Sequence, residues 1–228
     1  MSFLFTDDFN RADVELDGNF AWVCQAGTTF FKVVSNVVEM QQPRTSQTHY
    51  MRNTTTLQDD QWIGFKGVSG TTALVLIARD AASSPITQYQ TEFTGSSWRL
   101  HKTVLGVDTI LATDSSTNPN FNDEDTVVLE CTGSSPVTLK IYRNGNLALS
   151  TTDTIAPITS GQPGFYMSAT GNKLDNFVVA TSVADAHLFA STGSSFLIAS
   201  DGAGIWDQMK ESGSVTSDVL HQAELIDV

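Results

Sequence analysis

The amino-acid sequence predicts an all-β protein built from two packed antiparallel sheets. Short runs of β-branched and aromatic residues follow one another from residue 20 to residue 180, and apolar residues hardly ever recur there at helical spacing. Turn residues (Gly, Ser, Asp, Asn and Pro) separate these runs at near-regular intervals. Because the links are too short for helical crossovers, neighbouring runs are expected to pair antiparallel.

Two hairpins are expected from their turn residues. Residues 30–41 hold two apolar runs about Ser35-Asn36, and residues 140–150 hold two runs about Asn144-Gly145, which tolerate the positive φ angles of a type I′ turn. Further strands are expected at residues 71–80, 86–93, 96–106, 108–114, 125–133 and 136–143. The expected total is about a dozen strands, which suits two sheets packed face to face.

Alternating polarity predicts which strands have one face in water. In residues 86–93, Tyr89 and Phe93 fall on one face of the strand, and in residues 98–104, Trp98, Leu100 and Val104 fall on one face. The polar faces carry Gln88, Gln90, Glu92, Arg99, His101 and Thr103. These two strands are therefore expected to present a polar face away from the core.

Charge excludes several classes of partner. The chain has 12 basic and 25 acidic residues, a net charge of −13, and no run of Lys or Arg. Nucleic acid and anionic membranes are therefore not expected partners.

The first ten residues lack the basic region of a signal peptide and the length of a membrane anchor, which predicts synthesis in a cytoplasm. Cys24 and Cys131 lie in apolar runs and are expected to be buried thiols, with a disulfide as the alternative.

Composition divides the chain at about residue 180. Residues 1–180 are expected to form the sandwich, and residues 181–228, with seven acidic residues and one basic residue, a C-terminal arm. A strand pair about Thr192-Gly193-Ser194 and two short helices are expected in the arm. Its apolar side chains cannot bury enough surface among themselves, so the arm is expected to pack on the sandwich or on a neighbouring subunit. The candidate interface residues are Phe189, Phe196, Ile198, Trp206, Leu220 and Leu225.

The order of several short motifs resembles one known fold family. The stretch DDFNRAD is followed by Leu16, Gly18 and Trp22, and later come LIARD, YQTEFTGSSWRLHK, GQPGFYM and LDNF. Over residues 1–180 this order resembles the concanavalin A-like lectin/glucanase (laminin-G-like) jelly roll found in tailed-phage virion proteins. The resemblance implies that the first and last strands are neighbours in one sheet. It also implies that Phe9 and Phe177 are both in the core and that the sandwich closes at about Ala180.

Catalytic motifs are absent from the sequence. Glucanases that share this sandwich use two carboxylates in a Glu-x-Asp-x-x-Glu pattern on one strand, and that spacing does not occur here. The sequence also lacks HExxH, CxxC, GxSxG and a phosphate-binding Gly-rich loop ending in Lys-Ser/Thr. A non-enzymatic protein is therefore expected, with a glycoside hydrolase as the weaker alternative.

Two kinds of binding site are candidates. Asp7, Asp8 and Asp175 would meet if the terminal strands pair, which would create the oxygen-rich environment of a structural calcium ion. The alternative is that these carboxylates hold turns by accepting backbone N–H groups. Sugar binding needs an aromatic ring with planar polar groups beside it. The glycan-site candidates, with a core role for Tyr89 as the alternative, are Tyr50, Arg79, Tyr89, Arg99 and His101.

These features predict a non-enzymatic phage virion protein, either a capsid decoration or a tail component. It is expected to form a homo-oligomer, to contact other virion proteins and to reside in the virion. The alternative is a carbohydrate-binding adhesin or receptor-binding module that recognises a cell-surface glycan, with Arg79, Tyr89 and Arg99 on the recognition face.

Overall fold

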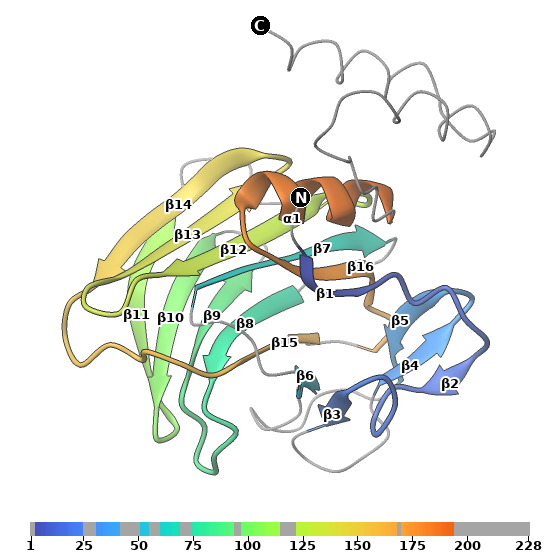
Figure 1. The fold of residues 1–228 in the computed structure, drawn as a ribbon, viewed down its shortest axis with the longest axis horizontal. Coiled ribbons are helices and arrows are strands. Elements are labelled where there is room, and N and C mark those ends of the chain that lie inside the picture. The colour runs from blue at the N-terminus through green and yellow to red at the C-terminus, as the bar shows by residue number, and fades with distance from the viewer. Residues whose placement is uncertain are drawn as a thin grey trace, which may run out of the picture. The chain divides into compact units, whose positions relative to one another are not determined.

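The structure is a computed structural model that describes residues 3–24, 31–41, 51–54, 60–68, 74–93, 97–114, 122–167 and 170–193. Ser2–Ser195 form one compact unit, whereas a second unit, Met1 with Phe196–Val228, lies outside the described residues. The described residues form two antiparallel β-sheets and one α-helix, which is a jelly-roll sandwich (Figure 1). The predicted all-β sandwich is confirmed.

The larger sheet has nine strands among the described residues and is called the nine-stranded sheet. β1 pairs with β16 beside the main path of this sheet. The order along that path is β14 (Asn146–Asp153), β13 (Val137–Arg143), β12 (Thr126–Thr132), β7 (Gln61–Val68), β16 (Lys173–Ala180), β5 (Val37–Met40), β4 (Phe31–Val34) and β2 (Val14–Glu15), and β1 spans Phe3–Asp7.

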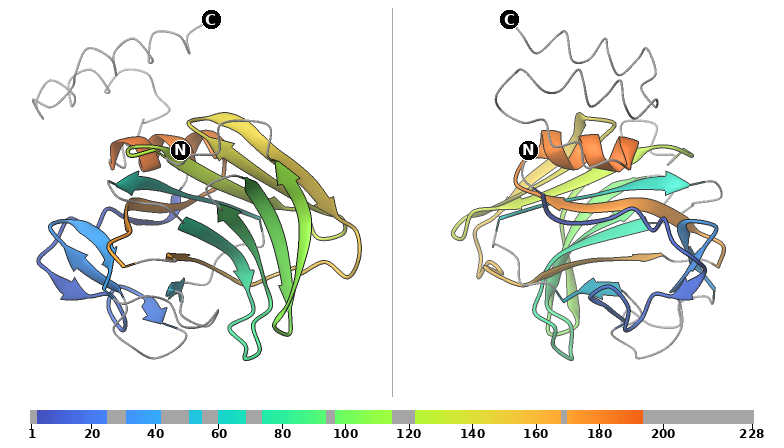
Figure 2. Two further views of the ribbon diagram at one scale, coloured as in Figure 1. Left: turned by 180° about the vertical axis from the view of Figure 1, so that it is seen from behind. Right: turned by 45° about the vertical axis from the view of Figure 1, so that its right-hand side comes forward.

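The second layer is the seven-stranded sheet, counted over the same described ranges. Figure 2 shows the two layers from other directions. The strand order is β11 (Val107–Asp114), β10 (Trp98–Val104), β9 (Gln88–Phe93), β8 (Leu74–Asp80), β15 (Gln162–Met167), β6 (Met51–Asn53) and β3 (Trp22–Cys24). The expected hairpins are confirmed: β4 and β5 flank Ser35-Asn36, β13 and β14 flank Asn144-Gly145, and all four turn residues have positive φ angles.

The two terminal strands of the sandwich pair as the resemblance implies. β1 runs antiparallel to β16, with Asp7 opposite Phe177. Phe9 and Phe177 are both fully buried, and the Phe177 ring lies edge-on to Trp22 with their centroids 4.9 Å apart. β16 ends at Ala180, where the sandwich was expected to close. Aromatic packing between the sheets therefore joins the two ends of the sandwich sequence.

The single described helix, α1 (Val183–Thr192), covers the outer face of the nine-stranded sheet (Figure 1). The Ser182 hydroxyl caps its start by accepting from the Asp185 N–H, and Gly193 in the left-handed region ends it. The expected strand over residues 187–192 is therefore wrong. A helical face packs there on the sheet, in a cluster that comprises Val128, Val178, Ala180, Ala186, Phe189 and Ala190.

Phe189 has a different role from the one predicted for it. It is buried between α1 and the sheet, with its ring 5.6 Å from the ring of Phe3, so it stabilises its own domain and is not open to a partner. The other candidate interface residues, Phe196, Ile198, Trp206, Leu220 and Leu225, lie outside the described residues. No helix in the described ranges is long and apolar enough to cross a membrane.

Candidate functional site

The outer face of the seven-stranded sheet carries a group of polar side chains, here called the outer polar cluster. It is formed by the adjacent strands β9 and β10, on the face opposite the core. The register places Arg99 opposite Glu92 and His101 opposite Gln90. The members of the cluster are Gln88, Gln90, Glu92, Arg99 and His101. The alternation predicted for these strands is confirmed for Tyr89, Phe93, Trp98 and Leu100, which lie in the core. The expected water-facing side is wrong for Gln88, Gln90 and His101, which are buried, and Val104, predicted on the core side, is 39% exposed.

Glu92 is the centre of the hydrogen bonding in this cluster. Its Oε2 accepts from Arg99 Nη1 at 3.3 Å and from His101 Nε2 at 2.9 Å. Because a carboxylate only accepts, the His101 proton must be on Nε2, which leaves Nδ1 of the neutral ring as an acceptor. The Arg99 and Glu92 side chains are 35% and 31% exposed, whereas His101 is 8% exposed. Arg99 and Glu92 therefore form the accessible rim of the cluster, and His101 lies at its base.

Several buried polar atoms on this sheet lack a hydrogen-bond partner. They are His101 Nδ1, Gln88 Oε1 and Arg99 Nε in the outer polar cluster, and Gln162 Oε1 on β15. A buried polar atom without a partner costs about 1–3 kcal/mol, so such atoms are rare in folded proteins. Three of these atoms belong to the outer polar cluster, so its side chains do not satisfy one another completely.

Apolar side chains lie beside the polar ones on the same face. A small cluster, separate from the main core, is formed by Val75, Ile77, Ile86 and the aromatic ring of Tyr166. The register brings Ile77 opposite Gln90, so this apolar group adjoins the outer polar cluster directly. All four of these apolar side chains are buried, so they support the polar cluster from beside it.

Two of the predicted sugar-binding residues lie in the interior. Arg79 and Tyr89 are both fully buried, so neither lines an open face, and the interpretation of Tyr89 as a core residue holds. β8 has a register shift between Ile77 and Asp80, and Arg79 within it has a φ of +52°, which turns its side chain inward. Tyr50 lies outside the described residues. Of the predicted set, the structure brings together Arg99 and His101.

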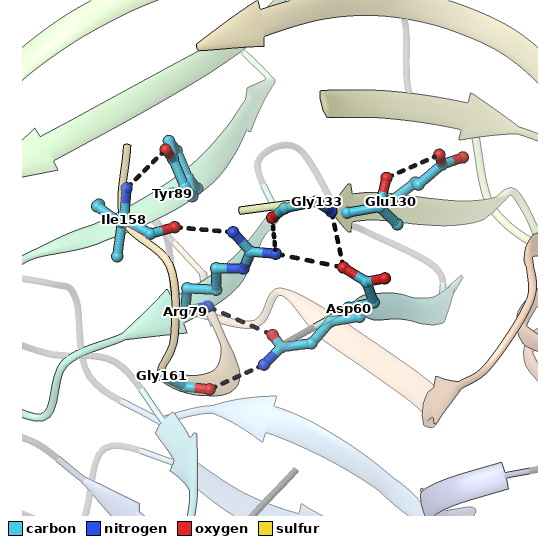
Figure 3. A network of polar contacts seen from close by, with 9 residues as sticks. Asp60, Arg79, Tyr89, Glu130, Gly133, Ile158 and Gly161 are labelled. Atoms are coloured by element: carbon cyan, nitrogen blue, oxygen red, sulfur yellow. Dashed lines mark hydrogen bonds and ion pairs between the residues drawn. The ribbon is translucent and has the colours of Figure 1, made fainter. Parts of the chain in front are cut away.

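Arg79 and Tyr89 hold the segment that links β14 to β15 (Figure 3). Arg79 donates to the carbonyl oxygens of Ile158 at 2.8 Å and of Gly133 at 2.7 Å, while the Tyr89 hydroxyl accepts from the Ile158 N–H at 2.9 Å. The Tyr89 hydroxyl also donates to Asp153 at 2.7 Å. Burial, reinforced by that carboxylate, raises the pKa of Tyr89. These residues have structural roles because every polar end is used within the chain.

The predicted calcium site is not formed by the described residues. Asp7 already accepts four hydrogen bonds, from the N–H of Phe9, from both Nη atoms of Arg11 and from Trp22 Nε1. A carboxylate has about four acceptor positions, so Asp7 cannot also bind a cation in this conformation. Asp8 and Asp175 each accept from a backbone N–H nearby, as the alternative expects. Across the described ranges, no three His, Cys, Asp or Glu side chains are grouped to hold a metal ion.

Sequence reasoning missed part of the site. Gln88, Gln90 and Glu92 were placed on the polar face but were not counted among the sugar-binding candidates, and Gln162 was not considered. The alternation that identified Arg99 and His101 also identifies the three residues on β9. Because β9 and β10 are adjacent, residues on the same face of both strands lie side by side, and this pairing could have identified the β9 residues as site candidates.

Comparison with solved structures confirms the fold. The carbohydrate-binding module CBM66 from Bacillus subtilis aligns with 71% of this chain and 96% of its own, at 12% identity and a TM-score of 0.52. A LamA variant from Z. galactanivorans, solved with laminaritriose and laminaritetraose, aligns with 79% of this chain and 99% of its own, at 10% identity and a TM-score of 0.51. This protein therefore shares the jelly-roll fold of these two structures. No protein-family model and no curated protein matches the sequence.

Proposed function

We propose that this protein is a non-catalytic carbohydrate-binding module whose ligand binds at the outer polar cluster. The observation that carries the proposal is the row of polar side chains on the outer face of the seven-stranded sheet, where the paired Arg99 and Glu92 side chains are 35% and 31% exposed. Sugar hydroxyls both donate and accept, so one ligand can bond to the exposed ends of Arg99 and Glu92 together. One of the similar structures is itself a carbohydrate-binding module, which supports this class of ligand.

The same face supports binding without hydrolysis. Glycoside hydrolysis on two carboxylates requires a second Asp or Glu close to the first. Glu92 is the only acidic residue on β9 and β10, and its Oε2 is held by Arg99 and His101. A glycoside hydrolase therefore remains the weaker alternative, and release of reducing sugar from a bound glycan would revive it.

A binding screen tests the proposal directly. The full chain is screened against an array of polysaccharides and oligosaccharides, and each hit is titrated by calorimetry. The double variant Arg99→Ala/His101→Ala is expected to weaken binding at least tenfold, because it removes the donors and acceptors of the cluster. Lys140→Ala is the matched control, since Lys140 is 31% exposed and pairs with Glu130 on the other sheet. Equal losses in the two variants, or silence across the array, would contradict the proposal.

For the setting of this module we propose the virion of a tailed phage, either on the capsid or in the tail. The support is the order of the motifs along residues 1–180, which resembles that of tailed-phage virion proteins. A homo-oligomer is part of this proposal, because virion components assemble by symmetry. Light scattering on the full chain and co-sedimentation with purified particles test it. A protein that is monomeric and stays in the supernatant would refute the virion setting. It would not affect the proposal of a glycan site.

A further inference from the structure

A pocket lies beside the nine-stranded sheet, away from the outer polar cluster. It is a pocket of about 430 Å³ between β1, the turn that follows β1 and the end of α1. The pocket is lined by Phe5, Thr6, Asp7, Asp8, Arg11, Phe20, Phe189 and Gly193. Pockets of this size hold small ligands or a single large side chain.

The lining of this pocket combines three phenylalanines with polar and charged residues. Phe5 and Phe189 contribute apolar surface from β1 and α1, and Phe20 is 58% exposed, which is unusual for a phenylalanine. The guanidinium of Arg11 lies 4.0 Å from the centroid of the Phe20 ring. Aromatic faces attract cations. The site therefore already stabilises one guanidinium group against an aromatic ring.

The charge of the pocket lining is negative. Both Nη atoms of Arg11 bond Asp7, at 2.5 Å and 2.9 Å, so these two charges compensate each other. Asp8 is exposed and forms no ion pair with any described residue, and its Oδ1 accepts only from the Asn10 N–H at 3.0 Å. One negative charge is therefore left at the pocket without a cation.

The residues around the pocket add further negative charge. Asp175, on β16 next to β1, is partly buried, and burial raises its pKa to about 6, with a further contribution from Asp8. The net charge of the whole chain, −13, acts in the same direction. An anionic ligand is therefore disfavoured here. A metal ion is disfavoured too, because Asp7 has no acceptor position left.

We infer that this pocket binds a monovalent organic cation with an apolar stem, such as the end of an arginine or lysine side chain of a partner protein. Asp8 supplies the opposite charge, and the rings of Phe5 and Phe20 contact the stem. The same chemistry would suit the ammonium group of an amino sugar, so the experiment has an arm for each source.

The experiment measures binding of small probes to the full chain at low salt by saturation-transfer NMR and calorimetry. Argininamide represents a basic side chain and glucosamine represents an amino sugar. Citrullinamide keeps the α-amine of argininamide but has a neutral ureido group in place of the guanidinium. We expect argininamide or glucosamine to bind at least fivefold more tightly than citrullinamide. The tighter of the two cations identifies the source.

Variants locate the binding and control for overall charge. Asp8→Asn and Phe20→Ala change exposed side chains and are expected to weaken binding of the cation at least fivefold with unchanged melting temperatures. Asp123→Asn removes an equally exposed carboxylate from the turn before β12 and is expected to change binding less than twofold. Equal binding of citrullinamide and argininamide, or equal effects of Asp8→Asn and Asp123→Asn, would overturn the inference. Neither result depends on whether a glycan binds at the outer polar cluster.

Discussion

The outer faces of the two sheets differ in what covers their side chains. On the nine-stranded sheet, α1 buries an apolar cluster, and Thr126 forms a hydrogen bond with His187 of the helix at 2.9 Å. On the seven-stranded sheet, polar side chains are buried, yet several of their atoms have no partner. The first face contributes stability through apolar burial, whereas the second keeps polar groups that are not fully hydrogen-bonded within the chain. We expect substitutions on the two faces to separate these roles.

Removal of α1 is expected to have the largest effect. A chain that ends at Ala180 lacks the helix and leaves Val128 and Val178 exposed, so it should aggregate or fail to give a cooperative unfolding transition. A chain that ends at Ser195 retains the whole compact unit and is the matched control, which should unfold cooperatively. Circular dichroism and light scattering measure both. If the chain ending at Ala180 were soluble and unfolded cooperatively, α1 would be dispensable for the stability of the sandwich.

A single substitution under the helix should have the next largest effect. Phe189→Ala removes the aromatic contact between α1 and Phe3 and leaves a cavity, which is expected to cost about 3 kcal/mol of unfolding free energy. Urea denaturation measures the loss. Ser191→Ala, on the exposed side of the same helix, should change stability by less than about 0.5 kcal/mol. Similar losses in both variants would mean that α1 is not docked through Phe189.

Two buried glutamines provide the sharpest test of the comparison. Gln61 uses both ends of its side chain, donating to the Gly161 carbonyl at 2.8 Å and accepting from the Arg79 N–H at 3.3 Å. Gln88 donates to Gln90 at 3.0 Å, and its Oε1 has no partner. We expect Gln61→Met to cost about 2 kcal/mol or more and Gln88→Met to cost less than about 1 kcal/mol.

The same pair of variants should have the opposite ranking in ligand binding. Gln88→Met should weaken the binding of any glycan found in the screen, and Gln61→Met should leave it unchanged in protein that remains folded. A loss of stability in Gln88→Met as large as that in Gln61→Met would mean that Gln88 Oε1 is satisfied in solution. The outer polar cluster would then be structural.

Asp175 gives the smallest expected effect, which depends on pH. Burial raises the pKa of this carboxyl in the folded state from 3.8 to about 6, so ionisation destabilises the folded state as the pH rises from about 4 to about 6. Asp175→Asn removes the titration and can keep the bond from the Asn176 N–H. With an allowance for solvent screening, we expect the variant to be about 1 kcal/mol more stable at pH 7 and equal to the parent near pH 4. Denaturant titrations of both chains between pH 4 and pH 7 measure the difference in unfolding free energy. If the parent chain gained stability relative to the variant as the pH rises, the prediction would be refuted.

Local patterns predicted much of the fold and about half of the candidate site. The hairpins about Ser35-Asn36 and Asn144-Gly145 follow from turn residues that accept positive φ angles. Arg99 and His101 share a face because side chains alternate along a strand. Such features depend on residues only a few positions apart, so they can be recognised without knowledge of the rest of the chain.

Other assignments failed where a distant contact outweighed the local pattern. Arg79 looked like a surface residue, but a register shift in β8 directs it to carbonyls of Ile158 and Gly133, 79 and 54 positions along the chain. Asp7 looked like a cation ligand, but Arg11 and the buried Trp22 occupy its oxygens. Residues 187–192 looked like a strand because their apolar content suits either element, and the sheet beneath them accepts a helix.

By itself, the sequence determined the strands, their turns and the polar or apolar character of each strand face, because these depend on a two-residue period and on local backbone preference. Only the tertiary structure decided which sheet face is covered by α1 and which retains unpartnered polar atoms. Gly64 illustrates the reason: a Cβ there would lie 3.3 Å from the carbonyl oxygen of Ala186, so the glycine allows the helix to pack closely on the sheet. That contact joins residues more than a hundred positions apart, and no local pattern encodes it.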